Sequence, residues 1–293
     1  MQILENNQFV VSINEFGAEL SGFRSKKDGT EYVWQADPAV WKRHAPILFP
    51  IVGRLKDKKY TVSGKEYEIT QHGFGRDLAW TPNRLSDTCV AFTLTQNEYT
   101  KKMYPWDFTC TIRYTLDGSS LKKEHITTNQ SDTPMYYEIG GHDAYAICLC
   151  AGEQITDYYV AFEGTDALHP IITDENVLLS QEHGCIPLQD GRLPITRQTF
   201  RDDALMLDSL TVRRAVIGSV KNPRRVTMDF ADFPYFALWS AYKDFDVKYV
   251  CLEPWSTLPD GDYLDHAIEN KAGVRVLQPG QSETLTFTTT ISE

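Results

Sequence analysis

Apolar and polar residues alternate with a period of two through much of this 293-residue chain, and short turn sequences separate the runs. The clearest case runs through residues 108–116, turns at Asp117-Gly118 and returns through residues 121–128. A period of two places every second side chain on one face of a strand, and Asp-Gly between two such runs is typical of a hairpin. No window keeps a helical period beyond about three turns. The pattern predicts long antiparallel strands with one buried face, and few, short helices.

Shorter runs of the same kind continue on both sides of this hairpin. Because so many strands must bury their apolar faces against one another, we expect an all-β fold, a large antiparallel β-sandwich. The chain has no Gly/Ser/Pro-rich linker and no repeat of fixed period, so we expect one domain over residues 1–293. The further strands are expected at residues 9–13, 20–25, 32–34, 60–62, 67–69, 146–150, 158–162, 177–179, 204–210, 226–230, 235–239, 247–252 and 285–290.

Charge and composition exclude several classes of partner. The 29 Lys and Arg against 40 Asp and Glu give a formal charge of -11, which repels nucleic acid. Neither a signal peptide nor an apolar stretch of about 18 residues is seen, so we expect a cytoplasmic protein that does not enter a membrane. The six cysteines lie in apolar, strand-like contexts without a C-x-x-C pair. We expect buried free thiols and neither disulfides nor a metal site.

The segment Ile139-Gly140-Gly141-His142-Asp143-Ala144-Tyr145 interrupts the strand pattern. Two adjacent glycines mark a place where the backbone bends or another group approaches closely. The imidazole that follows titrates near neutrality and can both hold and release a proton. A histidine satisfied at a strand end is the ordinary explanation of such a residue when it stands alone.

Four other polar positions also stand out in apolar or glycine-rich surroundings: Arg54, His72, Asp203 and Glu253. An ion pair, a turn and a strand cap would explain the first three. Glu253 follows the apolar run 249–252 and precedes Pro254, so we expect strand pairing to stop there. A carboxylate at this place is either paired or functional, because burial of its charge alone is costly.

Aromatic side chains stand beside several of these polar positions, among them Tyr145 and Trp255. A sugar offers flat C–H faces and a rim of hydroxyls, which aromatic platforms next to Arg, His and carboxylates are suited to bind. Most aromatic residues of a β-protein nevertheless belong to its core. Sequence patterns of serine hydrolases, nucleotide-binding loops and zinc proteases are absent. These residues favour a small sugar as the ligand.

Eight segments of the chain, in the order in which they occur, resemble the aldose 1-epimerase (galactose mutarotase) family, and in particular its LacX-like branch. The resemblance implies a large antiparallel sandwich with an open cleft, and an enzyme that interconverts the anomers of a free hexose without cofactor or metal. It extends over Gly17–Leu20, Pro46–Leu55, His72–Arg76, Gly140–His142, Asp203–Met206, Phe233–Tyr235, Cys251–Trp255 and Gly273–Gly280.

The resemblance also implies a role for each site residue. Glu253 matches the general base that takes the proton of the C1 hydroxyl, and His142 matches the general acid that protonates the ring oxygen. Arg54, His72 and Asp203 match substrate-binding positions, although Asp202 and Asp208 lie close enough in sequence to leave the choice of carboxylate open. We expect Glu253 and Asp203 to raise the pKa of His142 by favouring its charged form.

One departure from the family is visible after the histidine. Relatives usually carry Pro-Ala-Phe where this chain has Asp143-Ala144-Tyr145. An acid next to the imidazole is expected to bear on its charge state or on the sugar accepted.

Three other functions remain open at this point. A hexose-6-phosphate epimerase would need cationic groups at the cleft, for which Arg54, Arg76, Lys42 and Arg43 are candidates. A non-catalytic carbohydrate-binding protein or sugar sensor would not need a matched acid and base. A glycoside hydrolase would need a second carboxylate, for which no clear candidate exists. The chain is expected to be a monomer or a homodimer.

Overall fold

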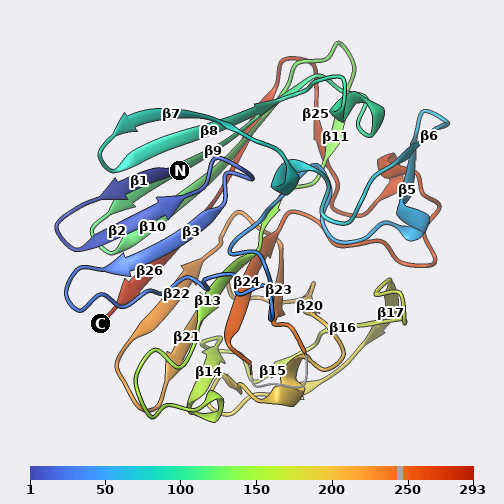
Figure 1. Cartoon of the computed structure of the whole chain (residues 1–293). Coiled ribbons are helices and arrows are strands. Elements are labelled where there is room, and N and C mark those ends of the chain that lie inside the picture. The colour runs from blue at the N-terminus through green and yellow to red at the C-terminus, as the bar shows by residue number, and fades with distance from the viewer. Residues whose placement is uncertain (243–246) are drawn as a thin grey trace.

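A computed structural model describes residues 1–242 and 247–293. Within these residues the longest antiparallel sheet has nine strands, and Figure 1 shows it as a twisted layer that runs from β7 to β14. Its centre is the predicted hairpin, in which every residue from Ser120 to Asn129 has a partner in the preceding strand. The strands in spatial order are β19 (Arg192–Pro194), β14 (Tyr158–Ala161), β21 (Arg214–Ser219), β22 (Arg225–Asp229), β26 (Ser282–Ser292), β10 (Ser120–Asn129), β9 (Phe108–Asp117), β8 (Cys89–Thr95) and β7 (Thr81–Ser86).

A second sheet packs against this layer and carries the polar residues singled out in the sequence. β24 is its central strand and is buried along its whole length. The order is β20 (Leu205–Leu207), β23 (Tyr235–Trp239), β24 (Tyr249–Trp255), β12 (Gly140–Gly141) and β4 (Ile47–Leu48), and β13 (Asp143–Ala146) also pairs with β24.

Smaller elements surround the two main sheets. The helical segments among the described residues are single 3₁₀ turns of three or four residues, as the sequence predicts. A third sheet contains β1 (Gln2–Glu5), β2 (Phe9–Ile13) and β3 (Leu20–Ser25). Four further sheets of the described chain have two strands each. They join β5 (Lys59–Val62) to β6 (Lys65–Glu68), β11 (Met135–Tyr137) to β25 (Arg275–Leu277), β15 (Ala167–Leu168) to β18 (Ile186–Pro187), and β16 (Ile171–Thr173) to β17 (Leu179–His183). The 3₁₀ turns are η1 (Lys56–Lys58), η2 (Gly75–Asp77), η3 (Thr100–Lys102), η4 (Ile155–Asp157), η5 (Arg197–Phe200) and η6 (Ile268–Asn270).

The main hydrophobic core lies between the layers. Phe92, Ile112 and Phe287 of the nine-stranded sheet and Val250 and Leu252 of the second sheet belong to one buried cluster. The all-β sandwich is therefore confirmed. The same cluster includes residues from β1 to β26, as expected for a single domain, and the domain count itself stays a prediction.

Several local expectations are wrong. The run 146–150 forms a strand only at its first residue, after which the chain turns with Cys148 at a positive φ of 57°. Strand pairing does not stop at Glu253, because β24 continues through Pro254 to Trp255. The cysteines are not all buried: Cys110 and Cys251 are, Cys89 and Cys150 are half-buried, and Cys148 and Cys185 are exposed.

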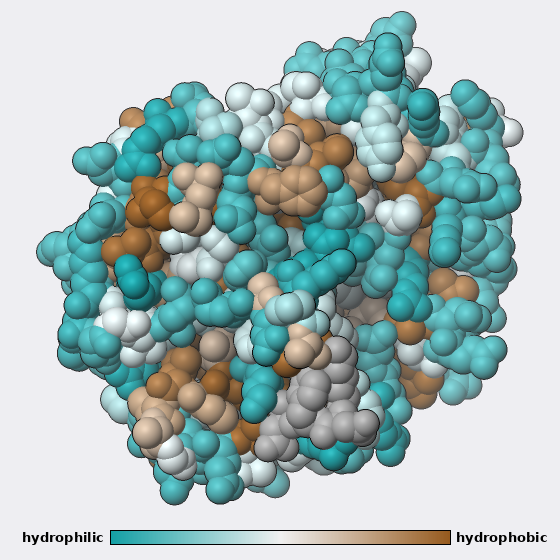
Figure 2. All heavy atoms as spheres, in the orientation of Figure 1, coloured by the Kyte–Doolittle hydropathy of each residue, from teal (hydrophilic) through white to brown (hydrophobic). Residues whose placement is uncertain are grey.

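The surface is mainly hydrophilic on the face shown in Figure 2, where hydrophobic residues form separate patches. No helix in the described ranges is long and apolar enough to cross a membrane.

Candidate active site

A gap in one strand ladder of the second sheet contains two of the predicted site residues. Asp143 pairs with Leu252 at the end of β13, and Gly140 pairs with Trp255 at β12. The register is the same on both sides of the gap, so His142 lies directly opposite Glu253. Opposite residues of an antiparallel pair share a face, and both side chains therefore point to the same side of the sheet.

This register also explains why a proline can continue the strand. Pro254 pairs with Phe236 of β23 on one side. On its other side Pro254 lies opposite the gap between β12 and β13, and neither of these strands pairs with it. A missing N–H is tolerated where no ladder hydrogen bond is required.

The glycine pair before His142 allows the strands to approach closely. A Cβ on Gly140 would lie 2.8 Å from Cδ1 of Trp255, and one on Gly141 would lie 2.8 Å from Cζ of Phe287. Real Cβ contacts are essentially never that short, so any side chain here would displace β24 or the facing sheet. The close approach expected from the two glycines is confirmed.

A cavity of about 290 Å³ opens over this gap. It brings together residues from β20, β23 and β24 and from the connecting segments, including six of the seven predicted site residues. The lining contains Trp41, Gly53, Arg54, Gln71, His72, Arg76, His142, Val177, Asp203, Ala204, Met206, Trp239, Glu253, Trp255 and Pro259.

Tyr145 is the predicted site residue that the structure places elsewhere. It lies three residues after His142 and is therefore on the opposite face of β13, fully buried in the main core. Its hydroxyl lies 2.7 Å from the Thr289 hydroxyl. The prediction that Tyr145 binds substrate is wrong, because strand alternation turns it away from the cavity.

His142 and Glu253 form a close pair at the base of the cavity. Nε2 of His142 lies 3.3 Å from Oε2 of Glu253, and the two residues are 7% and 1% exposed. Nδ1 of His142 and Oε1 of Glu253 are buried without hydrogen-bond partners in the described structure. The pair therefore retains unused donor and acceptor capacity beside an open cavity.

Burial shifts the pKa values of both groups toward their neutral forms. The pKa of Glu253 lies well above its usual range, mainly because of burial, and the negative charge of Asp203 adds to the shift. Burial lowers the pKa of His142 to about 3, and the positive charge of Arg76 acts in the same direction. The expectation that neighbouring carboxylates raise the pKa of His142 is wrong, because burial and the positive charges of Arg76 and Arg43 lower it. Both shifts favour the uncharged state of the pair, a carboxylic acid beside a neutral imidazole.

His72 is held in one tautomer by the segment that carries Arg54. The backbone N–H of Gly53 donates to Nδ1 of His72 over 3.0 Å, so the ring hydrogen must be on Nε2. Burial lowers the pKa of His72 well below its usual range, which keeps the ring neutral. Its ring centroid lies 5.6 Å from that of His142. Nε2 of His72 lies 3.3 Å from the side-chain amide of Gln71, which also lines the cavity, so the ring nitrogen and this amide face the cavity together.

Among the three neighbouring aspartates, the structure brings Asp203 to the cavity. Asp202 is bound to Arg201 at the surface, and Asp208 lies 3.0 Å from His183. Asp203 has a positive φ of 78°, which a non-glycine residue rarely adopts. This backbone conformation places the carboxylate before the short strand β20.

Trp41 is a site residue that the sequence did not reveal. Its ring stacks on the His142 imidazole with centroids 5.1 Å apart and an interplanar angle of 25°. Trp239 meets the same imidazole edge to face at 5.5 Å. Trp41 follows an irregular segment with neither strand pattern nor glycine, so only tertiary contacts identify it.

Asp143 does not face the cavity, although it follows His142 directly. Both of its carboxylate oxygens accept hydrogen bonds from Nζ of Lys123, at 2.7 and 2.8 Å. Lys123 belongs to β10, so this buried ion pair joins the two main sheets. Asp143 is therefore a structural partner of the facing sheet, on the other face of β13 from His142.

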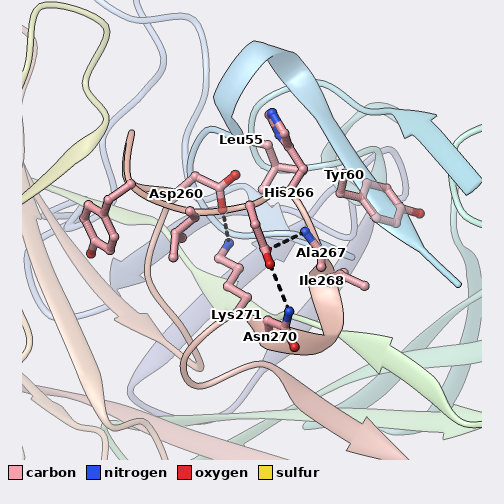
Figure 3. A pocket seen from close by; sticks show the side chains of 11 residues that line it. Leu55, Tyr60, Asp260, His266, Ala267, Ile268, Asn270 and Lys271 are labelled. Atoms are coloured by element: carbon pink, nitrogen blue, oxygen red, sulfur yellow. Dashed lines mark hydrogen bonds and ion pairs between the residues drawn. The ribbon is translucent and has the colours of Figure 1, made fainter. Parts of the chain in front are cut away.

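A second buried ion cluster fixes the loop segment that carries Arg54. Nζ of Lys271 lies 2.6 Å from Oε1 of Glu138 and 3.4 Å from Oδ1 of Asp260. Figure 3 shows Lys271 and Asp260 converging beside a separate cavity of about 230 Å³. The other carboxylate oxygens accept from backbone N–H groups, Glu138 from Val52 at 2.7 Å and Asp260 from Lys56 at 3.0 Å.

This cluster connects three of the segments that line the cavity. Glu138 lies four residues before His142, and Asp260 lies seven residues after Glu253. Both carboxylates clamp residues 52–56, and the N–H of Asp260 also donates to the carbonyl of Arg54 over 2.9 Å. No pattern in the sequence pointed to Glu138 or Lys271, because their pairing depends on loops that meet only in the folded chain.

The arrangement suits proton transfer on a polyhydroxylated ligand. An acid and a base lie in contact at the base of the cavity, with a hydrogen-bond donor, a guanidinium and a carboxylate around them. Trp239 and Trp255 supply apolar surface, as sugar binding requires. Among the described residues, a third potential metal ligand lies near the pair, Cys251.

Comparisons with known proteins identify the family and the fold. A profile of the aldose 1-epimerase family matches residues 1–290. The plasmid-encoded protein LacX of Lactococcus lactis subsp. lactis is 31% identical over 296 residues, which cover 98% of each chain. A galactose mutarotase related enzyme from Lactobacillus acidophilus superimposes with a TM-score of 0.94 and 33% identity, over 100% of this chain and 97% of that one. A galactose mutarotase-like protein from Lactobacillus casei gives 0.89 and 28%, covering 100% of both chains.

Proposed function

Because the chain belongs to the aldose 1-epimerase family, we propose that it is a carbohydrate epimerase that interconverts the α and β anomers of a free aldohexose. The observation that carries this proposal is the His142–Glu253 pair, with 3.3 Å between Nε2 and Oε2 at the base of a sugar-sized cavity. Ring opening needs one proton removed from the C1 hydroxyl and one delivered to the ring oxygen. A base and an acid in contact can do both.

In the proposed mechanism Glu253 takes the proton from the C1 hydroxyl while His142 protonates the ring oxygen. The C1–ring oxygen bond breaks, the open-chain aldehyde rotates about C1–C2, and closure on the other face returns both protons. The neutral pair of the empty site differs from the reactive form, with ionised Glu253 and protonated His142, by transfer of one proton between the two groups. The exchange of roles on closure restores the starting state.

The other lining residues are proposed to hold the sugar. Arg54 and Asp203 offer a donor fork and an acceptor to ring hydroxyls, and His72 donates through Nε2. Trp255 is proposed to contact a C–H face of the sugar, because its ring lines the cavity and its indole N–H lacks a hydrogen-bond partner in the described structure. Apolar contact with a few placed polar groups is typical of small-ligand sites.

The test is the rate of anomer exchange, measured by NMR magnetisation transfer on glucose and galactose. We expect H142N and E253Q each to lose roughly 10²-fold or more of the rate. H169N and E98Q carry the same chemical changes at exposed positions and should keep it. If the wild type binds sugars but leaves exchange at the background rate, a non-catalytic sugar-binding protein replaces this proposal.

The pH dependence of the same rate tests the shared proton. Since the pKa of His142 is lowered to about 3, the pair should not gain a second proton near neutrality. We expect no inflection near pH 6.5, where a free imidazole titrates. The rate should fall at high pH, where Glu253 loses the shared proton. An inflection near pH 6.5 that disappears in H142N would contradict the assignment.

A hexose 6-phosphate is a second candidate substrate. Arg54 and Arg76 line the cavity, and Nε of Arg76 is buried without a hydrogen-bond partner, its nearest carboxylate oxygen lying 3.8 Å away on Asp77. Guanidinium groups bind phosphate well. The exchange assay with glucose 6-phosphate distinguishes the two candidate substrates. If glucose 6-phosphate is preferred over glucose, R76Q should raise the KM for glucose 6-phosphate and leave the KM for glucose unchanged.

A further inference from the structure

The buried thiol of Cys251 lies next to the proposed catalytic pair. Cys251 precedes Glu253 by two residues on β24, so both side chains are on the same face of the strand. One donor atom each from His142, Cys251 and Glu253 lies within 4.8 Å of the others, and all three residues are buried. Within residues 1–242 and 247–293 this is the group of three such ligands that is close enough to share one ion.

The distances suit a tetrahedral zinc ion. Zinc bonds of about 2.0–2.2 Å to nitrogen and oxygen place two ligand atoms about 3.3–3.5 Å apart at the tetrahedral angle. The observed separation between His142 and Glu253 is 3.3 Å. A side-chain adjustment of about 1 Å would bring Sγ of Cys251 into the same sphere. Three protein ligands with a fourth position toward a cavity are the usual composition of an open zinc site.

A second observation also points to a ligand at this place. Oε1 of Glu253, on the carboxylate whose other oxygen faces Nε2 of His142, is fully buried and makes no hydrogen bond in the described structure. Buried polar atoms are nearly always paired, so the site has coordinating capacity that the protein does not use.

We propose that His142, Cys251 and Glu253 form an inhibitory binding site for a thiophilic divalent cation such as Zn²⁺. The ion reaches the pair through the cavity and occupies the lone pairs that the proposed proton transfer needs. Binding is a proton exchange: Zn²⁺ enters, the Cys251 thiol and the Glu253 carboxylic acid each release one proton, and His142 binds as the neutral ring. Inhibition rests on the proposed function, whereas metal binding does not.

Calorimetry and cobalt spectroscopy test the binding itself. We expect Zn²⁺ to bind the wild-type protein one to one with the release of about two protons, one for each acidic ligand. C251S should release about one and bind at least ~10-fold more weakly, since even outer-sphere changes cost 10–100-fold. Co²⁺ should give a sulfur-to-metal charge-transfer band in the wild type and none in C251S. C110S, at the other fully buried cysteine, is the matched control and should behave as the wild type.

The exchange assay then tests inhibition. Because Cys251 does not line the cavity, C251S should keep the basal rate but need at least ~10-fold more Zn²⁺ for half inhibition. Mg²⁺, which prefers oxygen ligands, should not inhibit. Absence of the cobalt band in the wild type overturns the proposal, and so does equal inhibition of wild type and C251S. If the protein shows no epimerase activity, the calorimetric and cobalt results still decide.

Discussion

Removal of the Lys271 ammonium tests how firmly the buried cluster holds the Arg54 segment. Lys271 is 8% exposed and neutralises Glu138 and Asp260, which are 0% and 4% exposed. In K271M two carboxylates face each other in the interior without a cation. Breaking a buried ion pair by deletion of one partner typically costs about 3–5 kcal/mol. We expect K271M to lose that much of its free energy of unfolding at pH 8.

The loss should depend on pH, which a mere packing defect would not. Burial already raises the pKa of Glu138, and the Lys271 ammonium opposes that shift. Without Lys271 the folded-state pKa rises further above the unfolded value, so the folded variant takes up a proton as the pH falls. Its stability is then greater at low pH and is lost as the pH rises, by up to about 1.4 kcal/mol per unit.

The assay is urea unfolding followed by tryptophan fluorescence at pH 8 and pH 5.5. We expect the K271M loss to be smaller at pH 5.5 by at least ~1 kcal/mol, and E138Q/K271M to recover part of it. K59M removes the exposed Lys59–Glu66 pair and should cost less than about 1 kcal/mol at both pH values. A K271M loss that is equally small, or the same at both pH values, would refute the reasoning.

Three further predictions concern the core and the stacked ring. Burial lowers the pKa of His125 to about 3, so as the pH falls the unfolded chain binds a proton on this histidine before the folded chain does. The free energy of unfolding of the wild type should therefore fall by up to about 1.4 kcal/mol per pH unit below pH 6.5. Urea unfolding at a series of pH values should show a weaker dependence of this free energy on pH for H125L. K123M and D143N should each lower the free energy of unfolding by about 3–5 kcal/mol, measured by urea unfolding, because each leaves one buried charge without its partner. The double variant K123M/D143N should lose less than either single variant. If the two single losses simply add in the double variant, the two residues are not a coupled pair. W41A should lower kcat/KM about 2–10-fold through loss of the stacking on His142, and W41F should retain most of it; equal rates in all three proteins would exclude a role for the stacking.

The long hairpin shows where sequence reasoning succeeds. Residues 108–116 alternate in burial in the structure as they alternate in hydropathy, and the Asp-Gly turn sets the register of the returning strand, whose buried face instead carries the polar residues Lys123, His125 and Thr127. Each of these signals is local and depends only on neighbouring residues. The close approach at Gly140 and Gly141 could be predicted for the same reason, since two adjacent glycines carry that information themselves.

The errors share a different cause. Proximity to His142 in sequence predicts Tyr145 at the cavity, yet strand alternation places it in the core. Nearby charges predict a raised pKa for His142, but the sequence does not show the desolvation that lowers it. Trp41 escaped notice because its contact with His142 depends on a segment a hundred residues earlier in the chain. In each case the property belongs to surroundings that a single segment does not contain.

The sequence by itself determined the fold class and the family, and six of the seven site residues predicted from it line the cavity. Alternation, turns and ordered motifs are local properties of the chain, so they can be recognised without a structure. Tertiary structure alone decided which face each residue occupies, which partner neutralises a buried acid, and how burial shifts a pKa. Asp143 illustrates the division: its sequence position suggests the active site, and only the facing sheet, with Lys123, makes it part of the core. Ion pairing and desolvation depend on contacts between residues far apart in sequence, and these contacts form only when the two sheets pack against each other.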